Sequence, residues 1–288
     1  MSIVVIVILV IYFKKNPHKL SKIYFKLKGS IFSDGSHLPK SYHEVNFFRN
    51  IPCKEDVFRF YYLNKIMGKV DLIALKAGLL SAIILQWVQK GNVSIQESEN
   101  IITRIAGSGK QRYKLKLHLK SSLENEWERL LFHFFRQAAD EVGVVTQSSF
   151  EQWYINNPML LEEWFNQVDQ GVVKQLIDDG DCTVTRNKGL FGVSKKVYSQ
   201  SLKEEMIQIM GFHKFIKEFS LVDQKSVSLW EKYLIFALPI RLADRVEKEI
   251  TKIYPEFDTH SQLRGISIAA FDTLFISSSI VQIRKNKN

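Results

Sequence analysis

Apolar residues recur at every third or fourth position along much of the chain, and this spacing predicts helices. The longest such stretches are residues 56–66, 71–89, 123–139, 158–177 and 201–219. The stretch at 71–89 is apolar on nearly all sides, which is typical of a helix buried within its own domain. Ser148 and Glu151 have capping-box spacing, so a further short helix is predicted to start there.

Shorter stretches alternate between apolar and polar residues, and they predict two hairpins. The first pairs residues 93–96 with 113–119 around a turn at 107–110, and the second pairs 182–185 with 190–193. A helix followed by strand, turn and strand is the order of a winged-helix module, and this order occurs twice. We therefore expect a helix-rich α+β fold with two winged-helix-like units.

Residues 211–257 hold the longest regular pattern of the chain, and they predict a helical hairpin at the end of the second unit. Ser228 and Glu231 have capping-box spacing at the start of one helix. Pro239 cannot donate a backbone hydrogen bond, so that helix ends or kinks there; proline also suits the first turn of a second helix. Pro255 stops the second helix.

Several short segments between residues 42 and 257 carry a family resemblance: GFHKF at 211–215 with FS at 219–220, LWEKYL at 229–234, ADRV at 243–246, FRNIPC at 48–53 and QWV at 86–88. On these segments the chain resembles the YciQ-like predicted membrane proteins, a family without an assigned activity. The resemblance implies the carboxy-terminal, cytoplasmic part of a membrane protein. The chain departs from the family pattern at Pro239 and Ile240, where the family has a glycine. The long extracellular amino-terminal domain usual in the family has no counterpart in these 288 residues, which fits either a shortened member of the family or a fragment of a longer one.

The amino-terminal segment predicts a membrane anchor. Residues 2–13 are an unbroken apolar run, followed by six lysines before the first acid, Asp34: Lys14, Lys15, Lys19, Lys22, Lys26 and Lys28. A full span takes about 20 apolar residues, so we expect the lysine stems to extend this shorter run toward the headgroups. Lysines after the run predict a single-pass protein of the cell membrane with its body in the cytoplasm. The alternative is a buried strand, because isoleucine and valine dominate the run.

Composition supports a packed body behind this anchor. The 288 residues are 45% hydrophobic and include 20 phenylalanines, and the net charge of +10 is concentrated near the amino terminus. Two cysteines far apart fit a reducing compartment and predict neither a disulfide framework nor a cysteine metal site. We divide the chain into an anchor with its basic segment (1–28), a linker (29–41), a first winged-helix-like unit (42–120), a second unit with the helical hairpin (121–257) and a tail (258–288).

The sequence predicts no catalytic or cofactor-binding motif. The glycines and lysine at 107–110 lack the upstream glycine of a phosphate loop, and Gln111 replaces its Ser or Thr. The acids at 178–181 lack the spacing and the distal glutamate of a calcium loop. The seven histidines are scattered without metal-ligand spacing. We therefore expect no catalytic, cofactor-binding or metal-binding residues, and no enzyme.

These observations favour a membrane-anchored cytoplasmic protein that works by binding, as a scaffold or accessory component at the membrane face. Its expected partners are membrane lipid, through the anchor and the six lysines, and a protein of unknown identity. The alternative is a membrane-tethered, winged-helix regulator that binds nucleic acid. Nucleic acid is the less favoured partner, because the helix at 71–89 places few polar side chains among many Leu and Ile.

Overall fold

The computed structural model describes residues 32–98, 112–118, 123, 125–186, 194–218, 227–253 and 267–272. These residues form a helix-rich α+β protein with two small antiparallel sheets, as the hydrophobic pattern predicts. The predicted anchor with its six lysines, the turn at 107–110 and most of the tail at 258–288 lie outside the described residues.

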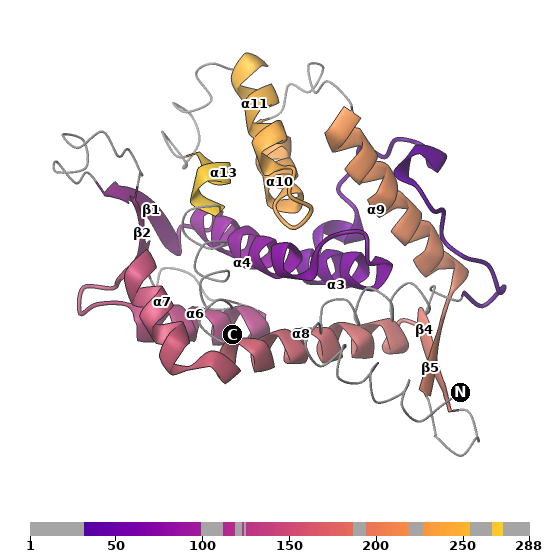
Figure 1. Ribbon diagram of the computed structural model, residues 1–288, viewed down its shortest axis with the longest axis horizontal. Helices are drawn as coiled ribbons and strands as arrows, with labels where there is room; N and C mark the ends of the chain where they lie inside the picture. Colours follow the sequence, from indigo (N-terminus) through magenta and orange to yellow (C-terminus); the bar gives the residue numbers. More distant parts are fainter. Residues whose placement is uncertain are drawn as a thin grey trace, which may run out of the picture.

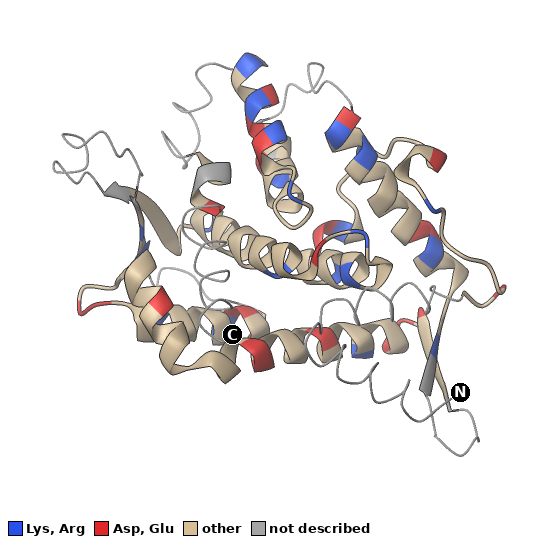
Figure 2. Ribbon diagram, in the orientation of Figure 1, with Lys and Arg blue, Asp and Glu red and all other residues tan. Residues whose placement is uncertain are grey.

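Two consecutive helices form the centre of the fold, α3 (Val57–Met67) and α4 (Leu72–Gln89). Each begins at an aspartate whose side chain accepts hydrogen bonds from the first-turn amides, Asp56 for α3 and Asp71 for α4. Figure 1 shows α4 between α10 and α11 on one side and α6 and α8 on the other. The α4 ribbon is almost free of charged residues, as its central position requires (Figure 2).

Length and apolar composition alone would let α4 cross a membrane, and α4 is the one such helix among the described residues. Buried core helices pass the same test, and 67% of α4 is buried inside this protein. It packs against α3, α10 and β1. The expectation that residues 71–89 form a helix covered by the rest of the body therefore agrees with the structure.

A three-stranded antiparallel sheet lies at the end of α4, with the order β1 (Val93–Ser98), β2 (Arg112–Leu117) and β3 (Val144–Thr146). Its inner face holds the buried side chains of Ile95, Leu115 and Val145, which are directly paired across the strands. β3 follows the expected boundary at 120/121, so this sheet joins segments from both expected units. One hydrophobic core accordingly runs from Phe32 to Phe271.

Two helices cover α3 and α4 on one side, α6 (Glu126–Ala138) and α8 (Pro158–Asp178). A third, α7 (Gln147–Asn156), packs against α6, α8 and the three-stranded sheet. The predicted capping box of α7 at Ser148 and Glu151 is wrong. The Thr146 side chain instead accepts from the amide of Ser149, and the Ser149 side chain accepts from the amide of Thr146. Thr146 is the last residue of β3, so pairing with β2 fixes the start of α7.

The second hairpin pairs β4 (Cys182–Arg186) with β5 (Ser194–Tyr198), and β5 leads into α9 (Gln200–Glu218). The predicted partner strand, residues 190–193, lies outside the described residues, and in the structure residues 182–185 pair with residues 195–198. The register pairs Cys182 with Tyr198, and this places the Tyr198 side chain in the core beside Phe32. Burial of these side chains accounts for this register.

The carboxy-terminal helices are α10 (Val227–Ala237), α11 (Ala243–Ile253) and the short α13 (Ile268–Phe271). The helical hairpin is confirmed, but the prediction that its second helix starts at Pro239 is wrong. Residues 238–241 form a turn in which Arg241 has a φ of 62°, and α11 begins only at Ala243. The backbone of this turn packs against Gly78 of α4, and a side chain at position 78 would collide with that backbone.

Candidate functional site

The six lysines predicted to lie at the membrane surface are outside the described residues, so the structure begins just after them. Phe32, the first described residue, is 1% exposed and forms a parallel bridge to Tyr198. The amide of Ser33 donates to the Tyr198 carbonyl at 2.7 Å. The amino-terminal segment therefore joins the body at β5, at a residue that is fixed in the core.

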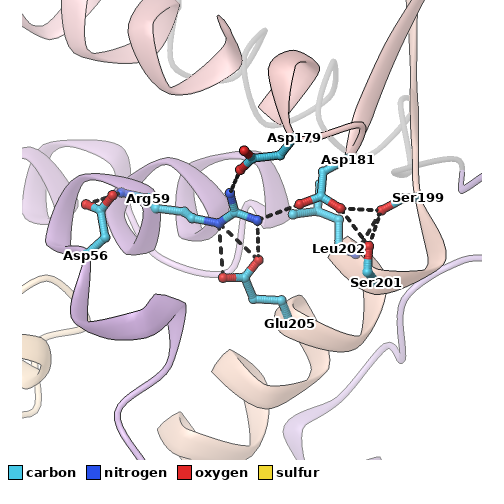
Figure 3. Close-up of polar contacts among 8 residues, drawn as sticks. All are labelled: Asp56, Arg59, Asp179, Asp181, Ser199, Ser201, Leu202 and Glu205. Carbon is cyan, nitrogen blue, oxygen red and sulfur yellow. Dashed lines mark hydrogen bonds and ion pairs between the residues drawn. The ribbon is translucent and has the colours of Figure 1, made fainter. Parts of the chain in front are cut away.

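An extensive polar cluster surrounds Arg59 of α3 (Figure 3). Its Nε donates to both Glu205 oxygens at 3.0 and 3.1 Å, and one terminal nitrogen donates to Glu205 at 2.7 Å. The same terminal nitrogen donates to Asp181 at 2.7 Å, and the other donates to Asp179 at 3.1 Å. One guanidinium thus links α3 to α9 and to the turn between α8 and β4.

Local sequence signals position each member of this Arg59 cluster. Asp56 caps α3 and accepts from the amide of Arg59, which fixes that residue in the first turn. Gly180 has a φ of 76° and allows the chain to reverse between α8 and β4, so that the flanking carboxylates of Asp179 and Asp181 both reach Arg59. Before α3, residues 53–55 all have positive φ, at 58°, 51° and 66°. A turn of three non-glycine residues in this region is strained.

Asp181 is also tied to the start of α9. Its Oδ1 accepts from the hydroxyls of Ser199 at 2.7 Å and Ser201 at 2.6 Å. The Ser199 hydroxyl accepts from the amide of Leu202, so Ser199 caps α9. Burial raises the pKa of Asp181, but hydrogen bonds from Ser201, Arg59 and Ser199 outweigh burial and leave the pKa below its ordinary value.

Burial alone would lower the pKa of Arg59, but its hydrogen bonds with Glu205 and Asp181 raise the pKa above the ordinary value. Arg59 and Asp181 are therefore both charged near neutral pH, and neither is ready to exchange a proton there. The arrangement suits a clamp between three elements better than a general acid or base. We assign the Arg59 cluster a structural role.

Further ion pairs continue from this cluster along the interface between α3–α4 and α6–α8. Lys65 pairs with Asp169, Lys76 Nζ donates to Glu162 at 2.6 Å, and Lys90 Nζ lies 3.7 Å from Glu128. In each pair the base comes from α3 or from α4 and its carboxy-terminal cap, and the acid comes from α6 or α8. Lys76 is therefore paired with an acid inside the protein. A helix that reads bases in a DNA groove would have to expose such a polar residue.

A smaller buried cluster joins the carboxy-terminal segment to α4. The hydroxyl of Ser81 donates to Asp272 Oδ1 at 2.6 Å, and Arg241 pairs with the other oxygen of Asp272. Ser81 is 1% exposed and Asp272 is 3% exposed. The segment 267–272 is thereby attached to α4 and to the turn between α10 and α11.

The charges of the body are balanced overall. The described residues contain 25 basic and 25 acidic side chains, counted as Lys and Arg against Asp and Glu. The net charge of +10 therefore resides in the remaining residues, and six of these charges are the lysines between positions 14 and 28. The positive surplus next to the apolar run is thus a property of the amino-terminal segment and not of the described body.

Within the described part of the chain, no three His, Cys, Asp or Glu side chains are placed to hold a metal ion. Cys53 and Cys182 are both buried with free thiols, and burial raises the pKa of each. Both are therefore poorly suited to act as thiolate nucleophiles.

Sequence reasoning missed the Arg59 cluster because its partners are distant along the chain. Arg59 is separated by 120 residues from Asp179 and by 146 from Glu205. The local signals were the cap at Asp56 and the acidic turn at 178–181. The sequence showed only that the acids of this turn lack the spacing of a calcium loop, and in the structure two of them bind Arg59. Neither protein-family models nor curated protein sequences give a match to this chain.

Proposed function

We propose that this chain is a membrane-anchored protein of the YciQ-like kind, whose cytoplasmic body binds a protein partner at the membrane face. Residues 1–28 are the anchor and its basic segment in this proposal. The observation that carries it is the charge distribution: 25 bases balance 25 acids in the described body, while six lysines without an acid follow the apolar run.

The lysine segment suits an anionic membrane surface. Each lysine held near such a surface contributes about 1 kcal/mol of binding free energy, and an adjacent apolar run adds insertion into the lipid. The described body has no comparable surplus, because many of its bases are neutralised internally, as Lys65 and Lys76 are. Lipid attraction is therefore assigned to residues 1–28.

The attachment at Phe32 would hold the body close to the membrane. Phe32 is only four positions after Lys28, and an extended chain of four residue steps spans at most about 14 Å. Phe32 is buried against Tyr198, so the body cannot move away from this point without local unfolding. A partner bound to this body would be presented at the membrane surface.

Two winged-helix-like units are part of the proposal, on the order α3, α4, β1, β2 and the order α6, β3, α7, α8, β4, β5. The charges favour a protein partner over nucleic acid for these units. α4 is largely buried, and the helices α6, α7 and α8 together hold seven acids and three bases. Such a surplus of acids along these helices repels the phosphates of a nucleic acid.

The test is membrane fractionation of the full chain, followed by a carbonate wash and by protease treatment of intact and lysed cells. We expect the full chain to remain with the membranes and its body to be cleaved only after lysis. A variant with Ile6→Lys and Leu9→Lys should leave the membrane fraction, because each charge in the apolar run opposes insertion.

Lys174→Gln is the matched control, since Lys174 is exposed on α8 and far from the anchor in sequence. It should fractionate as the unmodified chain does. Recovery of the unmodified chain in the soluble fraction would overturn the proposal and make residues 2–13 a buried element of the body.

A further inference from the structure

The outer face of the three-stranded sheet carries a regular polar pattern with two lysines at its centre. Strand register places Ser94, Lys116 and Val144 in one row across the sheet and Gln96, Lys114 and Thr146 in the next. We call these six residues the basic sheet face. The opposite side of each strand holds the core residues Ile95, Leu115 and Val145, so alternation turns both lysines away from the core.

The two lysines differ from the lysines of α3 and α4, which form ion pairs. No carboxylate of the described residues lies within ion-pair distance of Lys114 or Lys116; Lys116 Nζ donates instead to the carbonyl of Val142. The nearby carboxylate of Asp140 is turned to the backbone, where its Oδ1 accepts from the amides of Val142 and Val144. Neither lysine of this face is therefore paired with an acid among the described residues.

We infer that the basic sheet face is a second membrane contact, which binds the anionic headgroups of phospholipids. This inference rests on the proposed membrane tether and adds to it a named surface of the body. Lys114 and Lys116 supply charge, and Gln96, which is exposed opposite Lys114, supplies a hydrogen-bonding side chain. The Ser94 hydroxyl pairs with His118, and the Thr146 hydroxyl accepts from the amide of Ser149. Val142, which is 66% exposed beside Lys116, adds an apolar side chain at the rim.

Lipid fits this face better than nucleic acid does. Sheets that bind single strands stack the bases on aromatic side chains, and none of the six residues of this face is aromatic. Reading a duplex requires an element that enters a groove, and the neighbouring helix α4 is largely buried. With both modes of nucleic-acid recognition disfavoured, the two lysines can still attract anionic groups, and this attraction does not depend on a base sequence.

β2, the central strand of the sheet, and β5, to which Phe32 is bridged, lie toward opposite ends of α8 (Figure 1). α8 has 21 residues and a length of about 31 Å. With the anchor inserted, the second contact forms within one molecule, so a few charges suffice to shift its equilibrium. Two contacts at this separation would fix the orientation of the body on the membrane.

The experiment uses the full chain reconstituted in vesicles and a water-soluble, lysine-acylating reagent, with mass spectrometry as the readout. Vesicles of phosphatidylcholine are compared with vesicles that also contain phosphatidylglycerol. We expect acylation of Lys114 and Lys116 to fall about fivefold in the anionic vesicles, the factor equivalent to roughly 1 kcal/mol per lysine. Lys174, exposed on α8, is the internal reference and should not change. High salt should abolish the protection.

A charge-reversal variant distinguishes a shared surface from local shielding. In Lys114→Glu, the acylation of Lys116 in anionic vesicles should return to its value in phosphatidylcholine; Lys174→Glu should leave it protected. If Lys114 is acylated equally in both kinds of vesicle while the chain is stably inserted, the proposed sheet contact is wrong and the proposed membrane anchor is unaffected. Failure of the chain to insert overturns both proposals. Binding to a duplex oligonucleotide that Lys114→Glu weakens, without protection by lipid, would replace lipid with nucleic acid.

Discussion

Gly78 of α4 lies directly against the carbonyl oxygen of Leu238, so closely that a Cβ at position 78 would stand 2.4 Å from that oxygen. It would also stand 2.5 Å from the Cα of Pro239. Both contacts are with backbone, which cannot rotate away as a side chain can. The absence of a side chain at one position of a buried helix therefore allows the turn between α10 and α11 to pack onto the centre of the protein.

Replacing Gly78 with alanine should destabilise the protein, although alanine is the better helix former. Overpacking against a fixed backbone costs about 3 kcal/mol, more than the roughly 1 kcal/mol that alanine contributes to a helix. Urea unfolding of the full chain in mild detergent, followed by tryptophan fluorescence, should show a lower midpoint. Gln170→Ala, an exposed change on α8, is the control and should leave the midpoint nearly unchanged. A midpoint for Gly78→Ala equal to that of the unmodified chain would contradict the close approach.

The buried cluster of Asp272, Ser81 and Arg241 predicts unequal effects of two substitutions. Asp272→Ala removes the buried carboxylate that accepts from Ser81 and pairs with Arg241, which costs about 3 kcal/mol. Ser81→Ala removes one hydrogen bond and costs about 1 kcal/mol. Both are measured by the same unfolding experiment.

The double variant of these two residues should have nearly the stability of Asp272→Ala alone, within a few tenths of a kcal/mol. The reason is that the Ser81 hydroxyl has already lost its acceptor in Asp272→Ala. Full additivity of the two effects would show that Ser81 and Asp272 do not interact. In that case the segment 267–272 would be held mainly by the apolar contacts of Ile268 and Phe271.

Local signals predicted most helices but not every helix start. Asp56 and Asp71 precede regular apolar patterns, and both cap the helices that follow. At α7 the spacing of Ser148 and Glu151 satisfied the same rule, yet the structure uses Thr146 and Ser149. The difference lies in the pairing of β3 with β2, a contact between segments about 30 residues apart that helix periodicity does not encode.

A tertiary contact also determines the backbone conformation around Pro239. A proline suits the first turn of a helix, so sequence alone placed the start of α11 there. In the structure the turn around Pro239 continues to Arg241 because its backbone rests on Gly78. The Arg59 cluster was beyond sequence reasoning for the same reason: each partner is ordinary in its own segment, and only the packing of α3, α8 and α9 brings them together.

The Arg59 cluster predicts that a lysine is a poor substitute at position 59. Arg59→Lys keeps the charge but loses the planar group that donates to Glu205, Asp179 and Asp181 together, and should cost about 2 kcal/mol. Arg59→Met leaves Asp181 and Glu205 without a cation and should cost about 4 kcal/mol. Urea unfolding at neutral pH measures both. Equal stability of the lysine variant and the unmodified chain would mean that only the charge matters.

Acid should weaken the same cluster through Asp181. Its folded-state pKa lies below the ordinary value of 3.8, so its stabilising contribution is fully present above that pH and is lost as the pH falls through the lowered pKa. Asp181→Asn should therefore be less stable than the unmodified chain at pH 7, and the difference should shrink below about pH 3.8. Ser201→Ala should show a smaller effect with the same sign. A difference that is constant down to the lowest pH would exclude Asp181 as the titrating group.

His213 predicts a second pH dependence, in a higher range. Its ring stacks on Tyr42 with centroids 4.0 Å apart, and its Nδ1 is buried without a hydrogen-bond partner among the described residues. Burial, with a contribution from Lys217, lowers the pKa of His213 to about 4, against 6.5 for the free side chain. Between these two values the unfolded chain binds a proton that the folded chain does not, so stability rises with pH across this window.

His213→Phe keeps an aromatic ring against Tyr42 and removes the titrating group. The unmodified chain should lose up to about 3 kcal/mol of stability between pH 6.5 and pH 4 through this residue, and the variant should not. Unfolding midpoints of both proteins across that range give the difference in pH dependence directly, because the carboxylates contribute equally to both proteins. Gln170→Ala, an exposed change on α8 that involves no titrating group, is the control and should leave the pH dependence unchanged. The same slope in His213→Phe as in the unmodified chain would show that this histidine is protonated while the protein is folded.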